Sequence, residues 1–174
     1  MTLRLLLVRH AGTAVTRTPV VPADEDATGA LDDLSTWLGR SGEVVTSPAR
    51  RCRRPSAEVE PLLRPWDLGA WTGRPLAELD LAAWRGDPGY DAHGGESLLV
   101  LLARVRHLLD QWHDRQGRLV AVTHAAVIKA AVVNVLRAPP SAIWDLDVHP
   151  GSATELHVGP RGWRAVRVNA TVVP

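Results

Sequence analysis

The sequence predicts an α/β protein, a three-layer α/β/α sandwich around a mostly parallel central sheet. Two short and nearly unbroken apolar runs, Leu3–Val8 and Leu119–Thr123, are typical of strands covered on both faces. Glu43–Thr46 is a shorter run of the same kind. Helical patterns separate these runs along the chain. Strands that alternate with helices indicate a sheet with helices packed on both of its sides.

Three segments have the apolar spacing of helices. The first helix is marked by Leu31, Leu34 and Leu38. The second is a long helix that begins near Glu96. Its apolar side chains form one stripe: Leu98, Leu101, Leu102, Val105, Leu108, Leu109 and Trp112. The third, at residues 125–136, is almost entirely apolar and is predicted to be buried.

The remaining segments predict a β-hairpin and loops within one domain. Residues 153–168 are predicted to form the hairpin, with the turn between Gly159 and Gly162. Segments rich in proline and glycine are interpreted as loops rather than linkers: Thr18–Gly29, Gly86–Gly95 and Ala138–Pro140. Residues 1–174 are therefore expected to form a single domain, and a chain of this length buries a sizeable core.

Composition and charge exclude several classes of protein. The formal net charge is +1, so no strong field attracts nucleic acid or a membrane surface. One cysteine, Cys52, excludes an internal disulfide and a cysteine-rich metal site, and it fits a reducing cytosol. Neither a signal peptide nor an apolar run of ~18 residues is found. We therefore expect a cytoplasmic protein without nucleic-acid or membrane partners.

Cationic and histidine side chains follow the three predicted strands where each strand ends. Arg9 and His10 follow the first, Arg50 and Arg51 come soon after the second, and His124 follows the third. Open α/β sheets bind ligands outside the carboxyl ends of their strands. Taken singly, such residues are more often surface arginines or packed histidines. Their joint position at three strand ends favours one anion-binding site.

The segments that carry these residues resemble the motifs of the histidine phosphatase superfamily. VRHAGT resembles the first motif, with Ala11 where glycine is usual, and SPARRC resembles the second and aligns Arg51 with its functional arginine. LRPWDLGAWTGRPLAEL, HGGESLLVLLARV and AVTHAAVIKAAV resemble three further motifs, the last of which surrounds the second histidine. The resemblance extends from about Leu3 to the C-terminal hairpin. It implies a phosphoglycerate mutase-like fold and a small phosphatase.

The resemblance also implies roles for four residues. Arg9 and Arg51 would clamp the equatorial oxygens of a phosphate monoester, and His124 would donate a further hydrogen bond to them. His10 would attack phosphorus and form a phosphohistidine, which water then hydrolyses. Because these side chains supply the positive charge, neither a metal ion nor another cofactor is expected. The expected partner is a small soluble phosphate ester.

The general acid is where the sequence departs from the family. Relatives commonly place a carboxylate at the position of Pro65, which has no proton to donate. Asp67 and Glu96 are the candidates that remain, although Glu96 has an alternative role in favouring a helix N-terminus. His93 is a further candidate, for the acid or for a substrate contact. A missing acid predicts faster turnover of aryl phosphates than of alkyl phosphates.

Other residues are candidates for contact with phosphate or substrate. Thr16 lies where relatives often place a phosphate-contacting asparagine, with an ST-turn as the alternative. Trp66 is a candidate for stacking on an aromatic substrate, with core packing as the alternative. Ala125, directly after His124, is a candidate contact at the start of its helix.

Two functions of different classes follow from these observations. The favoured one is a phosphomonoesterase, because the short spacing between motifs leaves no room for the extra segments that enclose substrate in mutases. The second is a phospho-ligand binding protein of the same fold, catalytically impaired at Pro65. Mutase-type phosphotransfer ranks third. The sequence determines neither the physiological substrate nor the oligomeric state.

Overall fold

The computed structural model describes residues 2–29 and 42–171, which are built around a six-stranded sheet of order β3-β2-β4-β1-β5-β6. The strands are β1 (Leu3–Arg9), β2 (Glu43–Thr46), β3 (Glu58–Val59), β4 (Gly117–Thr123), β5 (Ala153–Gly159) and β6 (Gly162–Ala170). The pairs β1–β4, β2–β4 and β2–β3 are parallel, whereas β1–β5 and β5–β6 are antiparallel. The predicted α/β class with a mostly parallel sheet is confirmed.

The C-terminal hairpin forms as the turn residues predict. Gly159 and Gly162 pair with each other across the turn between β5 and β6. Gly162 has a φ of +93°, a left-handed conformation that glycine adopts without a steric penalty.

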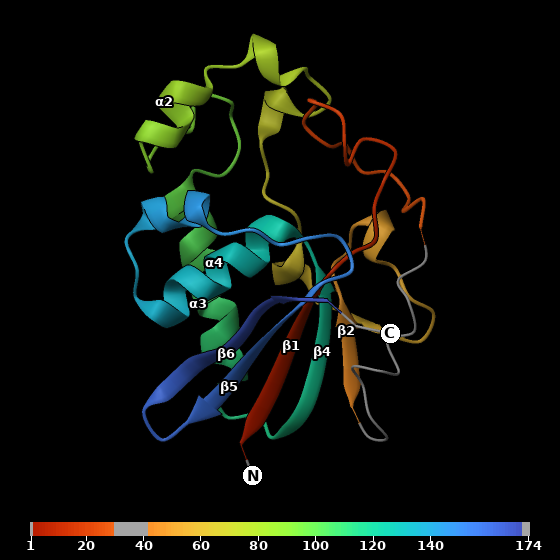
Figure 1. Ribbon diagram of the computed structural model, residues 1–174, viewed down its shortest axis with the longest axis vertical. Coiled ribbons are helices and arrows are strands. Elements are labelled where there is room, and N and C mark those ends of the chain that lie inside the picture. The colour runs from red at the N-terminus through yellow and green to blue at the C-terminus, as the bar shows by residue number, and fades with distance from the viewer. Residues whose placement is uncertain (1, 30–41, 172–174) are drawn as a thin grey trace.

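Three α-helices are found within the described residues: α2 (Leu81–Gly86), α3 (Leu98–Trp112) and α4 (Ala125–Leu136). Short 3₁₀ turns are η2 (Arg50–Cys52), η3 (Pro61–Leu63), η4 (Gly69–Trp71), η5 (Leu76–Glu78) and η6 (Pro140–Asp145). Helices α3 and α4 pack on each other and cover one face of the sheet (Figure 1). The helix predicted from Leu31, Leu34 and Leu38 lies outside the described residues, so the second helical layer is not described either.

Burial on both faces explains the unbroken apolar run of β1. Leu3, Leu5 and Leu7 belong to the main core, together with the predicted stripe of α3 and the buried side of α4. Leu6 and Val8 point to the other face and join a second cluster with Cys52, Val120, Val122 and Ala153. Every side chain of the predicted α3 stripe is buried.

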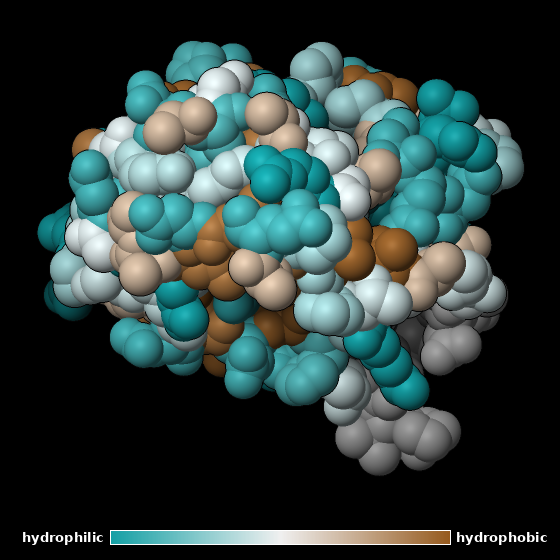
Figure 2. Space-filling model, turned by 90° about the horizontal axis from the view of Figure 1, so that it is seen from above, coloured by the Kyte–Doolittle hydropathy of each residue, from teal (hydrophilic) through white to brown (hydrophobic). Residues whose placement is uncertain are grey.

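Long loops lie above the carboxyl ends of the parallel strands (Figure 1). The loop after β1 pairs through its backbone with the segment before η5, since the Val21 N–H donates to the carbonyl of Arg74 and the Leu76 N–H to that of Pro19. The face seen from above shows hydrophobic patches in its middle among hydrophilic side chains (Figure 2).

None of the helices in residues 2–29 and 42–171 has both the length and the apolar character to cross a membrane.

Candidate active site

The parallel strands bring the four predicted residues to one cavity of about 270 Å³. Arg9 is the last residue of β1, and His10 follows it with its backbone N–H donated to the Thr123 carbonyl at the end of β4. Arg51 lies in η2, just after β2, and His124 is the N-cap of α4, just after β4. All four side chains line the cavity. The strand-end argument therefore predicted their convergence.

His10 is held in its neutral form. Its Nδ1 lies 2.6 Å from the carbonyl oxygen of Ala11, and because that oxygen only accepts, Nδ1 carries the proton. Nε2 then presents its lone pair, to which Arg51 Nε donates over 3.3 Å. The pKa of His10 is lowered to about 4, chiefly by burial and also by Arg51 and Arg9, while the hydrogen bond to Ala11 acts in the opposite direction. His10 is therefore uncharged at pH 7.

The two arginines are anchored by backbone carbonyls. Arg51 donates from Nη1 to the carbonyl of Ala23 over 3.0 Å, and the same nitrogen lies 3.7 Å from a carboxylate oxygen of Asp24. Arg9 donates from Nη1 to the carbonyl of Val148 over 2.6 Å. Burial lowers the pKa of Arg9, and the neighbouring Arg51 lowers it further. Two guanidinium groups are thus held beside one histidine.

Ser47 orients the second histidine and was not predicted from the sequence. Its hydroxyl lies 2.8 Å from Nε2 of His124 and accepts from the N–H of Ala49. The hydroxyl thus forms hydrogen bonds to the Ala49 N–H and to Nε2 of His124 together, which fixes the position of the imidazole ring. Burial, followed by Arg51, holds the pKa of His124 well below its usual range. Ser47 comes directly after β2, so the strand-end rule that selected Arg51 could have selected it too.

Two buried nitrogen atoms of residues that line this cavity lack a partner among the described residues: Nε of Arg9 and Nδ1 of His124. A buried polar group without a hydrogen bond costs about 1–3 kcal/mol. A bound anion that accepts from the Arg9 guanidinium would remove that cost for Arg9. The arrangement is therefore suited to a tetrahedral oxyanion held in front of the His10 lone pair.

Three further predicted residues, Thr16, Trp66 and Ala125, also line the cavity. The hydroxyl of Thr16 accepts from the N–H of Thr13, three residues before it, over 2.6 Å, which is not the ST-turn that was the alternative to a phosphate contact. Trp66 donates from its indole nitrogen to the carbonyl of Glu96 over 2.8 Å. All three are positioned to face a substrate.

The structure does not bring Asp67 or His93 to the cavity. Asp67 is exposed, and its carboxylate accepts from the N–H of Gly69 over 2.9 Å. His93 is buried beside Trp71, with ring centres 5.1 Å apart, and its Nδ1 accepts from the N–H of Gly95. Neither side chain has the position that a general acid or a substrate contact requires.

Glu96 is buried in a network of arginines rather than at the cavity. Its two oxygens accept from Nε and Nη2 of Arg104 over 2.8 and 2.7 Å, and from Arg64 over 2.7 Å. Glu96 directly precedes Ser97, the N-cap of α3, so its charge also lies beside the helix N-terminus, as its alternative role requires. Arg104 also donates to the carbonyls of Leu62, Arg64 and Pro65. This ion pair therefore positions the segment that carries the cavity wall.

Arg104 was not predicted, although its spacing gave a signal. It lies three residues after Leu101 and four before Leu108, on the apolar stripe of α3. A charged residue on a buried stripe needs a buried partner, and Glu96 provides it.

Within the described residues, no aspartate or glutamate lines the cavity, and Pro65 forms part of its wall. The same residues contain no group of three or more histidine, cysteine, aspartate or glutamate side chains arranged to hold a metal ion. The positive charge at the site comes from Arg9 and Arg51.

The fold and the site define a class: an α/β protein with two arginines and a neutral histidine in a cavity at the carboxyl ends of its parallel strands. Sequence comparison makes the assignment specific, because the model of the histidine phosphatase superfamily (branch 1) matches residues 5–171. The chain belongs to this superfamily.

Known relatives of the chain are phosphatases by name. Glucosyl-3-phosphoglycerate phosphatase of Mycolicibacterium vanbaalenii is 30% identical over 138 residues, which are 71% of this chain and 56% of that protein, so the chain matches little more than half of its relative. A mutant phosphoserine phosphatase from Entamoeba histolytica, solved with phosphoserine, gives a TM-score of 0.83 at 17% identity over 98% of both chains. A putative α-ribazole-5'-phosphate phosphatase from Escherichia coli gives 0.80 at 20% identity over 100% of both chains. These solved structures show the same fold.

Proposed function

We propose that the protein is a phosphomonoesterase that hydrolyses a small phosphate ester through a phosphohistidine at His10. The observation that carries this proposal is the cavity that His10, with the lone pair on its Nε2, lines together with Arg9, Arg51 and His124. Membership of the superfamily and the names of the relatives support the same class of reaction.

In the first step, His10 Nε2 attacks phosphorus. The N–P bond forms while the bond from phosphorus to the ester oxygen breaks, and its electron pair leaves with that oxygen. Arg9, Arg51 and His124 donate to the equatorial oxygens, where the charge of the transferring group is spread. The proton stays on Nδ1, which donates it to the Ala11 carbonyl, so the ring can carry the positive charge that develops during attack.

In the second step, a water oxygen attacks the phosphohistidine. The P–N bond breaks, the electron pair returns to His10 Nε2, and the water proton is released to solvent with inorganic phosphate as the product. The cavity opens to solvent between half-buried and exposed residues such as Thr18 and Pro22, which gives water access to phosphorus.

Partitioning experiments test this two-step scheme. Phenyl phosphate and 4-nitrophenyl phosphate are hydrolysed in the presence of methanol, which competes with water for the intermediate. A shared phosphohistidine gives the same ratio of methyl phosphate to phosphate from both esters, whereas a ratio that changes with the leaving group contradicts the scheme. H10Q should lose activity, while H107Q, a substitution on the exposed surface of α3, should keep it.

A second candidate function is phospho-ligand binding without turnover. It is favoured by one observation, the absence of a carboxylate among the described residues that line the cavity. Calorimetric binding of inorganic phosphate, together with no release of phosphate from 4-nitrophenyl phosphate, would support this second function over the first.

A further inference from the structure

We propose that the physiological ester of this site is the phosphate of an uncharged phenol. The inference rests on the proposed phosphomonoesterase function and adds the class of leaving group. Two independent features carry it: the chemistry available to expel the leaving group, and the character of the cavity wall that would contact it.

The first feature is that no carboxyl group of residues 2–29 and 42–171 lines the cavity that would hold the ester oxygen. Pro65 lines the cavity, Asp67 is turned to the Gly69 N–H, and both oxygens of Glu96 accept from arginines. The leaving oxygen therefore departs as an anion that takes its proton from solvent. A phenol has a pKa of about 10, whereas an alkyl alcohol is close to water at about 15.7. Phenolate leaves readily without an acid, and an alkoxide does not.

The second feature is the absence of charge around the leaving group. Apart from the phosphate-binding arginines and histidines, the described residues that line the cavity are uncharged: Thr13, Val15, Thr16, Thr18, Val20, Val21, Pro22, Pro65, Trp66, Leu68, Thr72, Ala125 and Ala126. No cation in this set is available to a second acidic group of the substrate. A carboxylate on the leaving group would lose water without gaining a partner.

Most hydroxyls of this wall are already occupied. Thr16 accepts from the N–H of Thr13 and lies 3.1 Å from the Thr13 hydroxyl, and the Thr18 hydroxyl donates to the carbonyl of Val15. The wall therefore offers few free partners to a sugar or a polyol. It favours an apolar leaving group.

Trp66 provides a fixed aromatic surface in this wall. Its ring centre lies 4.9 Å from that of Trp84 and 6.1 Å from that of Trp144, and its indole nitrogen is bonded to the Glu96 carbonyl. A ring held by two neighbouring indoles and a hydrogen bond loses little freedom when a planar substrate contacts its cavity-lining part. An aromatic leaving group can stack on Trp66, and as a phenolate it can also depart without a general acid.

A substrate series on the unmodified protein tests the inference. We compare kcat/KM for phenyl phosphate, butyl phosphate, 4-carboxyphenyl phosphate and phosphoserine. Phenyl phosphate is expected to exceed butyl phosphate by at least about 100-fold, the low end of what general acid catalysis contributes. It should exceed 4-carboxyphenyl phosphate by about tenfold, even though the carboxylate does not worsen the leaving group, because that charge meets no cation in the wall.

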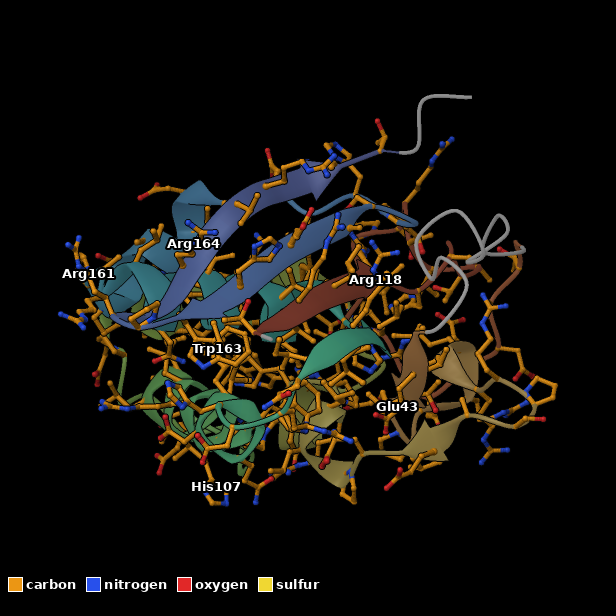
Figure 3. The ribbon with its side chains drawn as sticks, turned by 90° about the horizontal axis from the view of Figure 1, so that it is seen from below. Glu43, His107, Arg118, Arg161, Trp163 and Arg164 are labelled. Atoms are coloured by element: carbon orange, nitrogen blue, oxygen red, sulfur yellow. The ribbon has the colours of Figure 1, made fainter. Side chains whose placement is uncertain are left out.

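A pair of tryptophan variants tests the stacking surface. W66L should raise KM for phenyl phosphate about 2- to 10-fold, as expected from the loss of one aromatic pair. The inhibition constant of inorganic phosphate, which has no ring, should not change. The control is W163L, at the start of β6 near the hairpin turn on the lower side of the molecule (Figure 3), and it should change neither constant.

The outcomes separate this inference from the proposed function. Hydrolysis that depends on His10 but is as fast for phosphoserine or butyl phosphate as for phenyl phosphate overturns the phenol assignment alone. No hydrolysis of any ester in the series, with phosphate still bound, overturns the phosphomonoesterase proposal as well.

Discussion

Replacement of His10 should reduce the dependence of stability on pH. In the folded protein the pKa of His10 is lowered to about 4, chiefly by burial, from a value of 6.5 in an unfolded chain. Between these two values the unfolded chain binds a proton that the folded chain does not. The free energy of unfolding therefore falls as the pH drops from 6.5 toward 4, and the contribution of His10 is complete above pH 6.5.

The expected size follows from those two pKa values. At pH 5 the unfolded histidine is almost fully protonated and the folded one is mostly neutral, so linkage lowers the free energy of unfolding by about 2 kcal/mol relative to pH 7. Glutamine at position 10 does not titrate. H10Q should therefore lose about 2 kcal/mol less than the wild type between pH 7 and pH 5.

Urea unfolding of both proteins at the two pH values measures this difference. H107Q is the control, because His107 lies on the exposed side of α3 on the lower face of the molecule (Figure 3) and is solvated in both states. Its pH dependence should match that of the wild type. Equal losses of stability in H10Q and the wild type between pH 7 and pH 5 would refute the argument that His10 is neutral because it is buried.

Three further substitutions test the contacts of the site. R51K keeps the charge but loses the planar fork that faces the nucleophile, and kcat/KM for phenyl phosphate should fall about 100-fold, measured by phosphate release. S47A removes the hydroxyl that orients the second histidine, so kcat should fall about 10- to 100-fold while S47T keeps most of the activity; equal activity of S47A and the wild type would contradict this. E96Q leaves Arg104 buried without its charged partner and should destabilise the fold by about 3–5 kcal/mol in urea, whereas E78Q, in an exposed ion pair, should change stability little.

The sequence predicted the elements whose apolar pattern extends over several residues. Leu3–Val8 corresponds to β1, Glu43–Thr46 to β2, and residues 125–136 to α4 with the same bounds. Strand β3 was missed because it has only two residues and both are exposed, so it leaves no apolar pattern. The short helix α2 was missed for a related reason, since none of its residues is fully buried.

The convergence of the four cavity residues was predictable because the rule that governs it is topological. Parallel strands that end at one edge place the residues that follow them side by side, whatever the loops do. Arg9 is the last residue of β1, and His10 and His124 directly follow β1 and β4. Arg51 lies in η2, one short turn after β2. The aromatic contacts of Trp66 depend instead on how three distant segments pack, and no local pattern reports that.

The position of Asp67 shows where local reasoning fails. An extended segment would have placed its side chain on the same side as that of Pro65. The chain instead turns at Gly69, which has a φ of +50° and lies so close to residue 95 that a Cβ on Gly95 would come within 2.3 Å of the Asp67 carbonyl. This crossing of two backbones directs the Asp67 carboxylate to the Gly69 N–H. It depends on two segments far apart in the sequence.

The central claim is that the phosphoryl group passes through Nε2 of His10, and rapid quenching tests it most directly. The protein is mixed with phenyl phosphate for milliseconds, quenched in alkaline denaturant that preserves phosphohistidine, digested and analysed by mass spectrometry. The phosphoryl group should be found on His10 in the wild type and be absent from H10Q. Steady turnover with the phosphoryl group on another residue, or on none, would contradict the account.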